Sequence, residues 1–324
     1  MNVFAWYEEW PKLPLASCTH LSTGSFQTPN SELFRPTGRI MQITKLSAAH
    51  LPKCAALAPN FDVDDAALQR AGVNASVVAV ADDDPEQILG FLLAGSLGVR
   101  GVVHAPQLAP GVNGCTAETL RDAALNELRG MGVGRCHHLH PEPDSAHASF
   151  WHEARFAPQA GELLLELDLT RAPAEHVVLP AGYTLRPMRV EDAQEVIDLM
   201  SGDPVLAVAG WESEKLFQSM VTAHPGVCQV VEYEGRLVSA FVGGYFGHRA
   251  TNTHTFVAKE HRRSELGRAM TEAAADVLRR AGVTVLHLML TSNNTSPQKA
   301  FGFWMHLGFE VVDRDPSFLE ADLI

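Results

Sequence analysis

The segment from Thr253 to Phe309 constrains the fold more than any other part of the sequence. It opens with a short apolar run at 255–258, continues through a basic stretch at 259–268, and then shows apolar side chains at helical spacing. Gly282 ends the helical pattern in the way that glycine commonly ends helices. We therefore predict a strand, a basic turn and a helix in direct succession.

The predicted basic turn lies at the amino end of the predicted helix. The first backbone N–H groups of a helix have no partner within it, and the helix dipole adds a partial positive charge there. Four cations and two anions give the turn a charge of +2, in a chain whose net charge is −13. These features favour an anion site, most simply one for phosphate. The cations are Lys259, Arg262, Arg263 and Arg268.

The residues after the helix continue the alternation of strand and helix. A second apolar run at 283–290 predicts a buried strand, and the polar residues after it predict a loop. Ser296 and Pro297 favour the start of a helix, which we expect to run to Leu307. Gly308-Phe309 ends it, and a further strand begins directly afterwards.

With these elements in order, the sequence resembles the GNAT superfamily of acyl-CoA-dependent N-acetyltransferases. The first part of the resemblance is Arg262-x-x-x-x-Gly267 at the head of a helix. In that family the motif has the form Arg/Gln-x-x-Gly-x-Gly/Ala, and its backbone amides hold the pyrophosphate of coenzyme A. Glu265 departs from the pattern, because it stands where the first glycine is expected.

The second part of the resemblance is Ala300-x-x-x-Trp304-x-x-x-Gly308-Phe309. The family usually has a tyrosine at the position of Trp304. An indole N–H cannot protonate a leaving thiolate, so solvent or a hydroxyl such as Tyr245 or Ser292 would do so, or the step needs no acid. The resemblance covers roughly the last 140 residues, the size of an ordinary domain.

The resemblance implies that acetyl-CoA is the cosubstrate. In the family the thioester lies between two splayed strands, and backbone amides of the first strand contact it. The implied cofactor-binding residues are Val257, Lys259, Arg262, Arg263, Ser264, Glu265, Leu266, Gly267, Arg268 and Asn294.

Acetyl transfer to an amine also requires removal of a proton, because an alkylamine with a pKa near ~10 is protonated at neutral pH. His254 lies on the predicted strand just before the basic turn and is the candidate catalytic base. His248 and Glu232 are alternatives. A histidine on a strand is also common as a structural or surface residue, so both interpretations of His254 stay open.

The element order of the C-terminal half occurs once before in the chain. The offset between matching segments drifts slowly, as insertions in loops would cause. Segment 43–47 matches 185–189 at an offset of 142, 131–133 matches 281–283 at 150, and 150–151 matches 303–304 at 153. Two unrelated α/β domains that share common patterns are the alternative explanation.

We predict an α/β (α+β) fold with two tandem acetyltransferase-type domains, each a mixed central sheet flanked by helices. The expected parts are a weakly ordered extension at 1–40, a degenerate GNAT-like domain at 41–170, a linker at 171–182, and a C-terminal GNAT domain with the cofactor site at 183–324. This arrangement is similar to that of mycothiol synthase.

The first copy lacks the phosphate-binding features of the second. No Lys or Arg occurs between Gly101 and Leu120, and at an offset of 150 the counterparts of Arg262, Glu265 and Gly267 are Val112, Cys115 and Ala117. We therefore expect the first copy to cover the second sheet or to shape its acceptor cleft.

Composition limits the other classes of function. The balance of 25 basic to 38 acidic residues argues against nonspecific nucleic-acid binding, and no apolar run reaches membrane-spanning length. Five widely spaced cysteines do not predict a disulfide framework and favour the cytoplasm. Cys136, His138 and His140 would share a face of a strand, but no second ligand cluster accompanies them, so we predict no metal site.

We therefore expect an acetyl-CoA-dependent N-acetyltransferase that acts on a primary amine of a small molecule, with the C-terminal copy active. It would have neither nucleic acid nor membrane as a partner. The alternative is a non-catalytic acyl-CoA-binding or scaffold module, which Glu265 and Trp304 favour. The acceptor and the oligomeric state do not follow from the sequence.

Overall fold

The computed structural model describes most of the chain after residue 40. The described residues are 41–58, 68, 73–97, 100–112, 114–139, 145–159, 162–171, 177–202, 212–291, 297–313 and 318–323. The extension predicted at 1–40, together with His140, Ser292 and Asn294, lies outside them.

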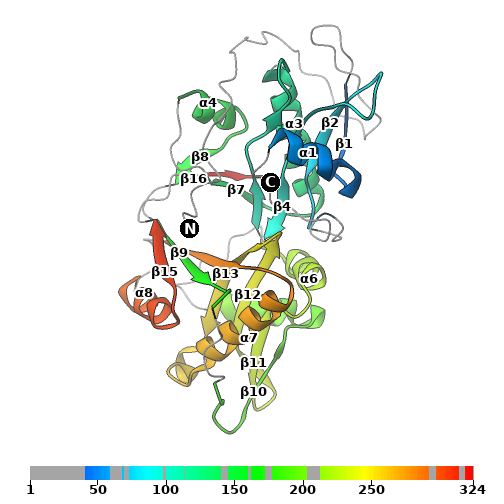
Figure 1. Ribbon diagram of the computed structural model, residues 1–324. Coiled ribbons are helices and arrows are strands. Elements are labelled where there is room, and N and C mark those ends of the chain that lie inside the picture. The colour runs from blue at the N-terminus through cyan, green and yellow to red at the C-terminus, as the bar shows by residue number, and fades with distance from the viewer. Residues whose placement is uncertain are drawn as a thin grey trace.

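The second half of the chain forms a seven-stranded mixed sheet (Figure 1). Neighbouring strands pair antiparallel except β13 and β14, which run parallel. Across the sheet the order is β10 (Tyr183–Pro187), β11 (Gln229–Tyr233), β12 (Arg236–Phe246), β13 (Arg249–Val257), β14 (Val285–Thr291), β9 (Glu162–Asp168) and β15 (Glu310–Asp313).

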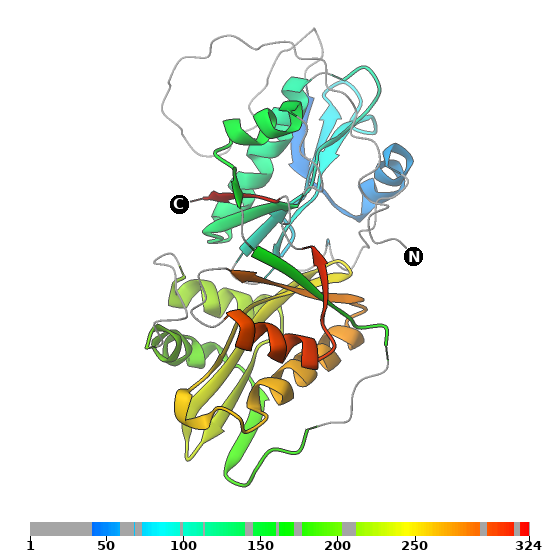
Figure 2. The same cartoon turned by 90° about the vertical axis from the view of Figure 1, so that its left-hand side faces the viewer.

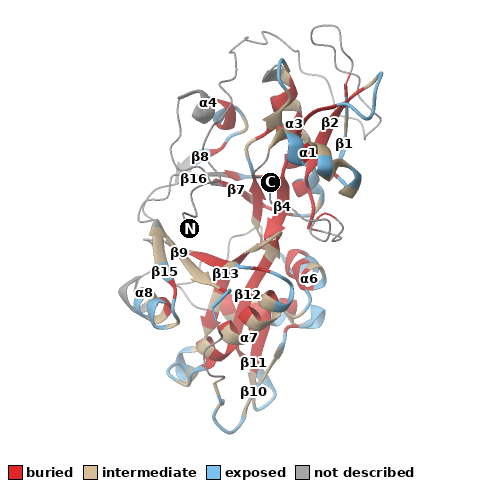
Figure 3. Ribbon diagram, in the orientation of Figure 1, coloured by how far each residue is buried: buried red, intermediate tan, exposed pale blue. Residues whose placement is uncertain are grey.

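Helices cover both faces of this sheet because its strands alternate apolar side chains between two cores. Val231 and Phe241 belong to the core beneath α7 (Leu266–Arg280) and α8 (Pro297–His306). Their neighbours Val230 and Ala240 belong to the core beneath α5 (Ala193–Ser201) and α6 (Glu214–Ala223). Successive residues of a strand point to opposite faces, so the two helix pairs lie on opposite sides. Figure 3 shows the buried residues gathered on the strands between them.

The first half repeats this order in two adjoining sheets. One sheet has the order β1-β2-β3-β6 and the other β4-β5-β7-β16-β8. The strands are β1 (Met41–Lys45), β2 (Val77–Ala81), β3 (Ile88–Leu92), β4 (Ala94–Leu97), β5 (Arg100–Val103), β6 (Gln107–Leu108), β7 (Arg135–Leu139), β8 (Ala157–Gln159) and β16 (Phe318–Asp322). The helices are α1 (Leu51–Leu57), α3 (Gly114–Gly130) and α4 (Ser145–Glu153).

The two halves exchange their last strands. β9 precedes the predicted linker in sequence, yet it lies between β14 and β15 of the second sheet. β16 is the last strand in sequence, yet it lies between β7 and β8 of the first half, where Figures 1 and 2 show it beside the N-terminal elements. The predicted boundary at residue 170 therefore follows the order of the chain but does not separate the two sheets. An apolar strand pattern identifies a strand without identifying the neighbour it pairs with.

Equivalent hydrogen bonds hold the two exchanged strands. Arg279 near the end of α7 donates from Nε to the carbonyl oxygen of Leu169, directly after β9, at 3.1 Å. Arg129 near the end of α3 makes the same bond to Leu323, directly after β16, at 3.0 Å. The repeat predicted from the sequence is therefore present in the fold, which is an α/β fold of two similar units.

Two further expectations from the sequence concern disulfide bonds and membrane-spanning segments. Cys54, Cys136 and Cys228 are free thiols, whereas Cys115 at the head of α3 is disulfide-bonded. The spacing of the cysteines did not predict a disulfide framework, and it did not predict the disulfide bond of Cys115. Within the described ranges, no helix combines the length and the hydropathy needed to cross a bilayer.

The strand exchange predicts that a change near the C-terminus destabilises the first half. Ala321 is 2% exposed and lies in the core of the first half, so Ala321→Asp would bury a carboxylate there and cost about 3 kcal/mol of folding free energy. Hydrogen exchange should then become faster in β7 and β8. The matched control is Asp322→Asn, which removes only an exposed ion pair to Arg135 and should cost less than ~1 kcal/mol. Faster exchange confined to β14 would contradict the exchange of strands.

Candidate functional site

The turn between β13 and α7 has two residues in a left-handed backbone conformation. Arg263 has a φ of 70° and Glu265 a φ of 59°. Side chains with a Cβ atom disfavour this region, which glycine adopts freely. This geometry explains why the family pattern has glycine at the position of Glu265.

The amino end of α7 is open to the turn. Glu265 is the N-cap residue, but its side chain does not cap the helix. The first backbone bond into the helix runs from the N–H of Ala269 to the carbonyl of Glu265 at 2.9 Å. Within the described part of the chain, the N–H groups of Leu266 and Gly267 have no backbone acceptor. Such groups bind phosphates at other helix ends, so the turn fits the predicted anion site.

The charged side chains of the turn differ in their exposure and in their hydrogen bonds to other residues. Lys259, Arg262 and Arg263 are exposed, and Arg262 donates from Nε to the carbonyl of Val257 at 2.9 Å. Arg268 is half-buried and bonds Glu272 at 2.7 Å.

Glu265 does not close the turn. Its side chain is 59% exposed and its carboxylate lies 3.8 Å from Arg268. A carboxylate so placed is largely solvated, so its repulsion of a bound phosphate is screened. Glu265 therefore reduces the positive charge of the turn without occupying it.

The structure brings the predicted cofactor-binding residues from Val257 to Arg268 onto one turn, while Asn294 lies outside the described residues. Gly267 lies close to α8. A Cβ atom there would come within 2.9 Å of the ring of Phe303 in α8, so glycine is needed for the packing of α7 against α8. Trp304 is 6% exposed and packs edge-on against Phe309, which makes it a core residue.

β13 and β14 pair over a short distance only. Their parallel register comprises Arg249–Val285, Ala250–Leu286 and Thr251–His287. On its other side β13 has a bulge next to Val242 and Gly243, where its register with β12 shifts. The described strands thus stop pairing at Thr251 and His287, and the remainder of β13 leads to the open end of α7.

His254, the predicted base, is buried beside a carboxylate. It is 7% exposed, its Nε2 lies 3.3 Å from Oε1 of Glu212, and the Glu212 side chain is 1% exposed. Burial lowers the pKa of His254 to about 3, and Arg100 of the first half acts in the same direction. The imidazole is therefore neutral at neutral pH, so its 3.3 Å contact with Glu212 does not join two full charges. A neutral imidazole of this pKa can accept a hydrogen bond but is a weak base at neutral pH.

The alternative bases have structural contacts. His248 lies at the turn before β13 and bonds the carbonyl of Gly282 through Nδ1 at 3.0 Å. Glu232 pairs with Arg186 at 2.6 Å. Cys136 and His138 lie in β7, and among the described residues no group of histidine, cysteine and carboxylate side chains could hold a metal ion.

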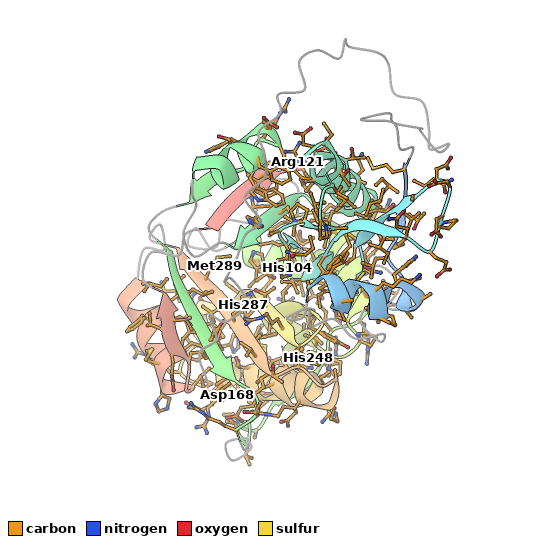
Figure 4. All side chains as sticks on the ribbon, turned by 45° about the horizontal axis from the view of Figure 1, so that its top comes forward. His104, Arg121, Asp168, His248, His287 and Met289 are labelled. Atoms are coloured by element: carbon orange, nitrogen blue, oxygen red, sulfur yellow. The ribbon has the colours of Figure 1, made fainter. Side chains whose placement is uncertain are left out.

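His287 is a polar residue of the site that the sequence analysis did not single out. It is 6% exposed, and burial, together with Arg249 and His137, lowers its pKa to about 3. Figure 4 shows it on β14, the strand that also carries Met289. The available signal was a lone histidine within the apolar run at 283–290.

A family model matches this region. Residues 224–311 match the model of the acetyltransferase (GNAT) domain, and they contain β13, the basic turn, α7 and β14. The second half of this chain carries a GNAT domain. No curated protein sequence matches the chain.

Solved structures show the likeness of the whole fold. A tandem GNAT protein from the clavulanic acid biosynthesis pathway is 20% identical and has a TM-score of 0.50, over 88% of this chain and 99% of that one. A Drosophila protein is 13% identical with a TM-score of 0.51, over 86% and 97%. A glucosamine N-acetyltransferase region of a fungal multi-domain enzyme is 13% identical with a TM-score of 0.50, over 88% and 38%.

The left-handed conformation of Glu265 predicts a stabilising substitution. Glu265→Gly should raise the free energy of unfolding by about 1 kcal/mol, because glycine adopts this conformation without a Cβ clash. Chemical denaturation measures the change. Glu265→Ala removes the same carboxylate but keeps Cβ, so it should give no comparable gain. Equal gains from both variants would assign the effect to charge instead of backbone conformation.

The contact between Gly267 and Phe303 predicts an energetic coupling. Gly267→Ala should destabilise the protein, since overpacking costs 1–3 kcal/mol and exceeds the ~1 kcal/mol that alanine gains over glycine in a helix. In the Phe303→Leu background the same change should cost little. A double-mutant cycle by chemical denaturation measures the coupling. Equal costs in the two backgrounds would contradict the packing role of Gly267.

Proposed function

We propose that the protein is an acetyl-CoA-dependent N-acetyltransferase whose C-terminal GNAT domain transfers acetyl to a primary amine of a small molecule. The observation that carries the proposal is the open amino end of α7, with the N–H groups of Leu266 and Gly267 beside exposed cations. Backbone donors and cations in this arrangement bind pyrophosphate well. A cytoplasmic location stays a prediction from the sequence.

The residues of the turn fit the phosphates of coenzyme A in distinct ways. Leu266 and Gly267 would donate backbone hydrogen bonds, while Arg262 and Arg263 would supply charge. When bound, acetyl-CoA supplies an activated acetyl group. The end of the β13–β14 ladder at Thr251 and His287 would then lie beside the reacting carbonyl.

The first half does not share this chemistry. At the head of α3 the counterparts of Arg262 and Glu265 are Val112 and Cys115, and Cys115 is disulfide-bonded. No Lys or Arg lies between residues 101 and 120, so an anion bound there would be held by backbone N–H groups without a nearby positive side chain from this segment. We therefore assign cofactor binding to the second half alone.

The alternative is a module that binds acyl-CoA without turnover. Glu265 was one reason to consider it, but the exposure of its side chain weakens that argument. Trp304 was the other, and it is 6% exposed and packs against Phe309, so its packing in the core accounts for a tryptophan at this position. Release of free thiol from acetyl-CoA in the presence of a panel of amines distinguishes the two functions, since a binding module would release none.

The basic turn predicts how coenzyme A binds. Arg262→Ala combined with Arg263→Ala should weaken binding by about 2–4 kcal/mol, because each arginine would lose a charge-assisted contact to phosphate. Calorimetry measures the affinity. Arg280→Ala is the matched control, since Arg280 is an exposed arginine at the far end of α7 and should have no effect. Unchanged affinity in the double variant would remove the turn from the cofactor site.

A further inference from the structure

Two buried imidazoles lie on one face of the second sheet, where β13 and β14 stop pairing. His287 pairs in register with Thr251 at the last position of the ladder, and His254 follows on β13. Leu286 and Leu288 point into the core beneath α7, so His287 points to the opposite face. The ring of His254 lies 6.4 Å from that of Phe217 in α6, which is on this same face.

Both imidazoles have a buried nitrogen without a partner. Nδ1 of His254 and Nδ1 of His287 are shielded from solvent, and neither has a hydrogen-bond partner among the described residues. Native proteins leave few buried polar atoms unsatisfied, so each such atom requires an explanation. Because Nε2 of His254 faces the Glu212 carboxylate, its Nδ1 carries the lone pair. A ligand that donates N–H hydrogen bonds would satisfy this nitrogen.

Charged groups from both halves surround His254 and keep it neutral. Arg100 of β5 disfavours its protonation electrostatically, and Nη1 of Arg100 also lies 3.0 Å from Nε2 of His137 in β7. Glu212 faces the imidazole from the residues before α6 and opposes this effect. Burial and Arg100 together lower the pKa of His254 to about 3, so the neutral form prevails.

His287 has an equivalent environment. Arg249 at the start of β13 and His137 of β7 disfavour its protonation, in addition to burial. Glu166 of the exchanged strand β9 is its register partner, but this carboxylate lies 3.3 Å from Nη1 of Arg249. Arg249 also acts on His104 of the first half. Each carboxylate that faces an imidazole thus has a contact of its own: Glu166 contacts Arg249, and Glu212 contacts His254.

We propose that this face binds the acceptor as an uncharged amine, whose N–H groups donate to the imidazoles of His254 and His287, and that the acceptor class is therefore amines of low basicity. The inference rests on the acetyltransferase function proposed above. An α-amino group with a pKa near ~8 is uncharged about 90 times more often at pH 7 than an alkylamine with a pKa near ~10. The positive charges of Arg100 and Arg249 near the two imidazoles would exclude an alkylammonium ion, and no protein group would need to deprotonate it.

The reaction balances without a protein group that stores a proton. The amine nitrogen forms a bond to the thioester carbonyl carbon, and the bond between that carbon and sulfur breaks. The thiolate leaves with the electron pair. The proton lost by the nitrogen passes to solvent or to the thiolate, which gives amide and free thiol. The imidazoles orient the nitrogen lone pair towards the carbonyl.

The pH dependence of kcat/KM tests the proposal. With acetyl-CoA as donor, kcat/KM should rise with pH up to the pKa of the acceptor itself, near ~8 for glycinamide and near ~10 for n-butylamine. A general base on the protein would instead give an inflection at one pH with both acceptors, and that result would overturn the proposal. Absence of thiol release with every amine would contradict the proposed function itself.

A substitution tests the role of the imidazole. His287→Leu should lower kcat/KM for glycinamide at least ~10-fold and leave the KM for acetyl-CoA unchanged, since the contact is to the acceptor alone. His152→Leu is the matched control: it is an exposed histidine of α4 and should change neither constant. Unaltered kinetics in His287→Leu would remove His287 from the acceptor site.

Nitrogen NMR of the wild-type protein gives a test that needs no turnover or variant stability. The imidazole signals of His254 and His287 should not titrate between pH 5 and 8, and glycinamide added at pH 8 should shift their Nδ1 resonances. N-acetylglycinamide, which lacks the amine, should not. Titration of either residue near pH 6.5, or equal shifts with both compounds, would overturn the inference while leaving the acetyltransferase proposal standing.

Discussion

The exchange of the last strands is the constraint on which the rest of the structure depends. β9 and β16 are interior strands, so each supplies hydrogen bonds to two neighbours in the sheet of the other half. Arginines from α3 and α7 fix the ends of these strands through equivalent bonds to backbone carbonyls. A sheet that loses an interior strand loses two ladders at once. Each half therefore lacks an interior strand of its sheet without the other half, although the two halves follow one another along the chain.

The same exchange determines which groups meet at the candidate site. Because β9 lies against β14, Glu166 of the first half faces His287 and binds Arg249. Arg100 reaches the environment of His254 from β5. The first half has no cation at its own helix head, yet it supplies charges to the acceptor face of the second. This role is compatible with the sequence-based expectation that the first copy shapes the acceptor cleft, and it stays a proposal.

Much of the fold follows from local patterns in the sequence. The strand, basic turn and helix around Arg262 were predicted because charge, helical spacing and Gly282 agree within one short segment. The repeat was predicted because short-range features recur at a slowly drifting offset. The exchange of β9 and β16 was missed, since pairing partners far apart in sequence leave no mark on a strand's own pattern. His287 was missed because burial and an unpaired nitrogen depend on neighbours from β9 and β13.

The interior position of β16 has a consequence for synthesis of the chain. Translation proceeds from the N-terminus, and domains commonly fold as they emerge from the ribosome. Here the sheet containing β7 and β8 stays incomplete until residues 318–322, near the end of the sequence, become available. The first half thus has an unpaired strand edge until residues 318–322 have been translated, and unpaired edges promote misassembly. Completion of the sheet that begins to form first therefore depends on a strand that is made after all the other strands.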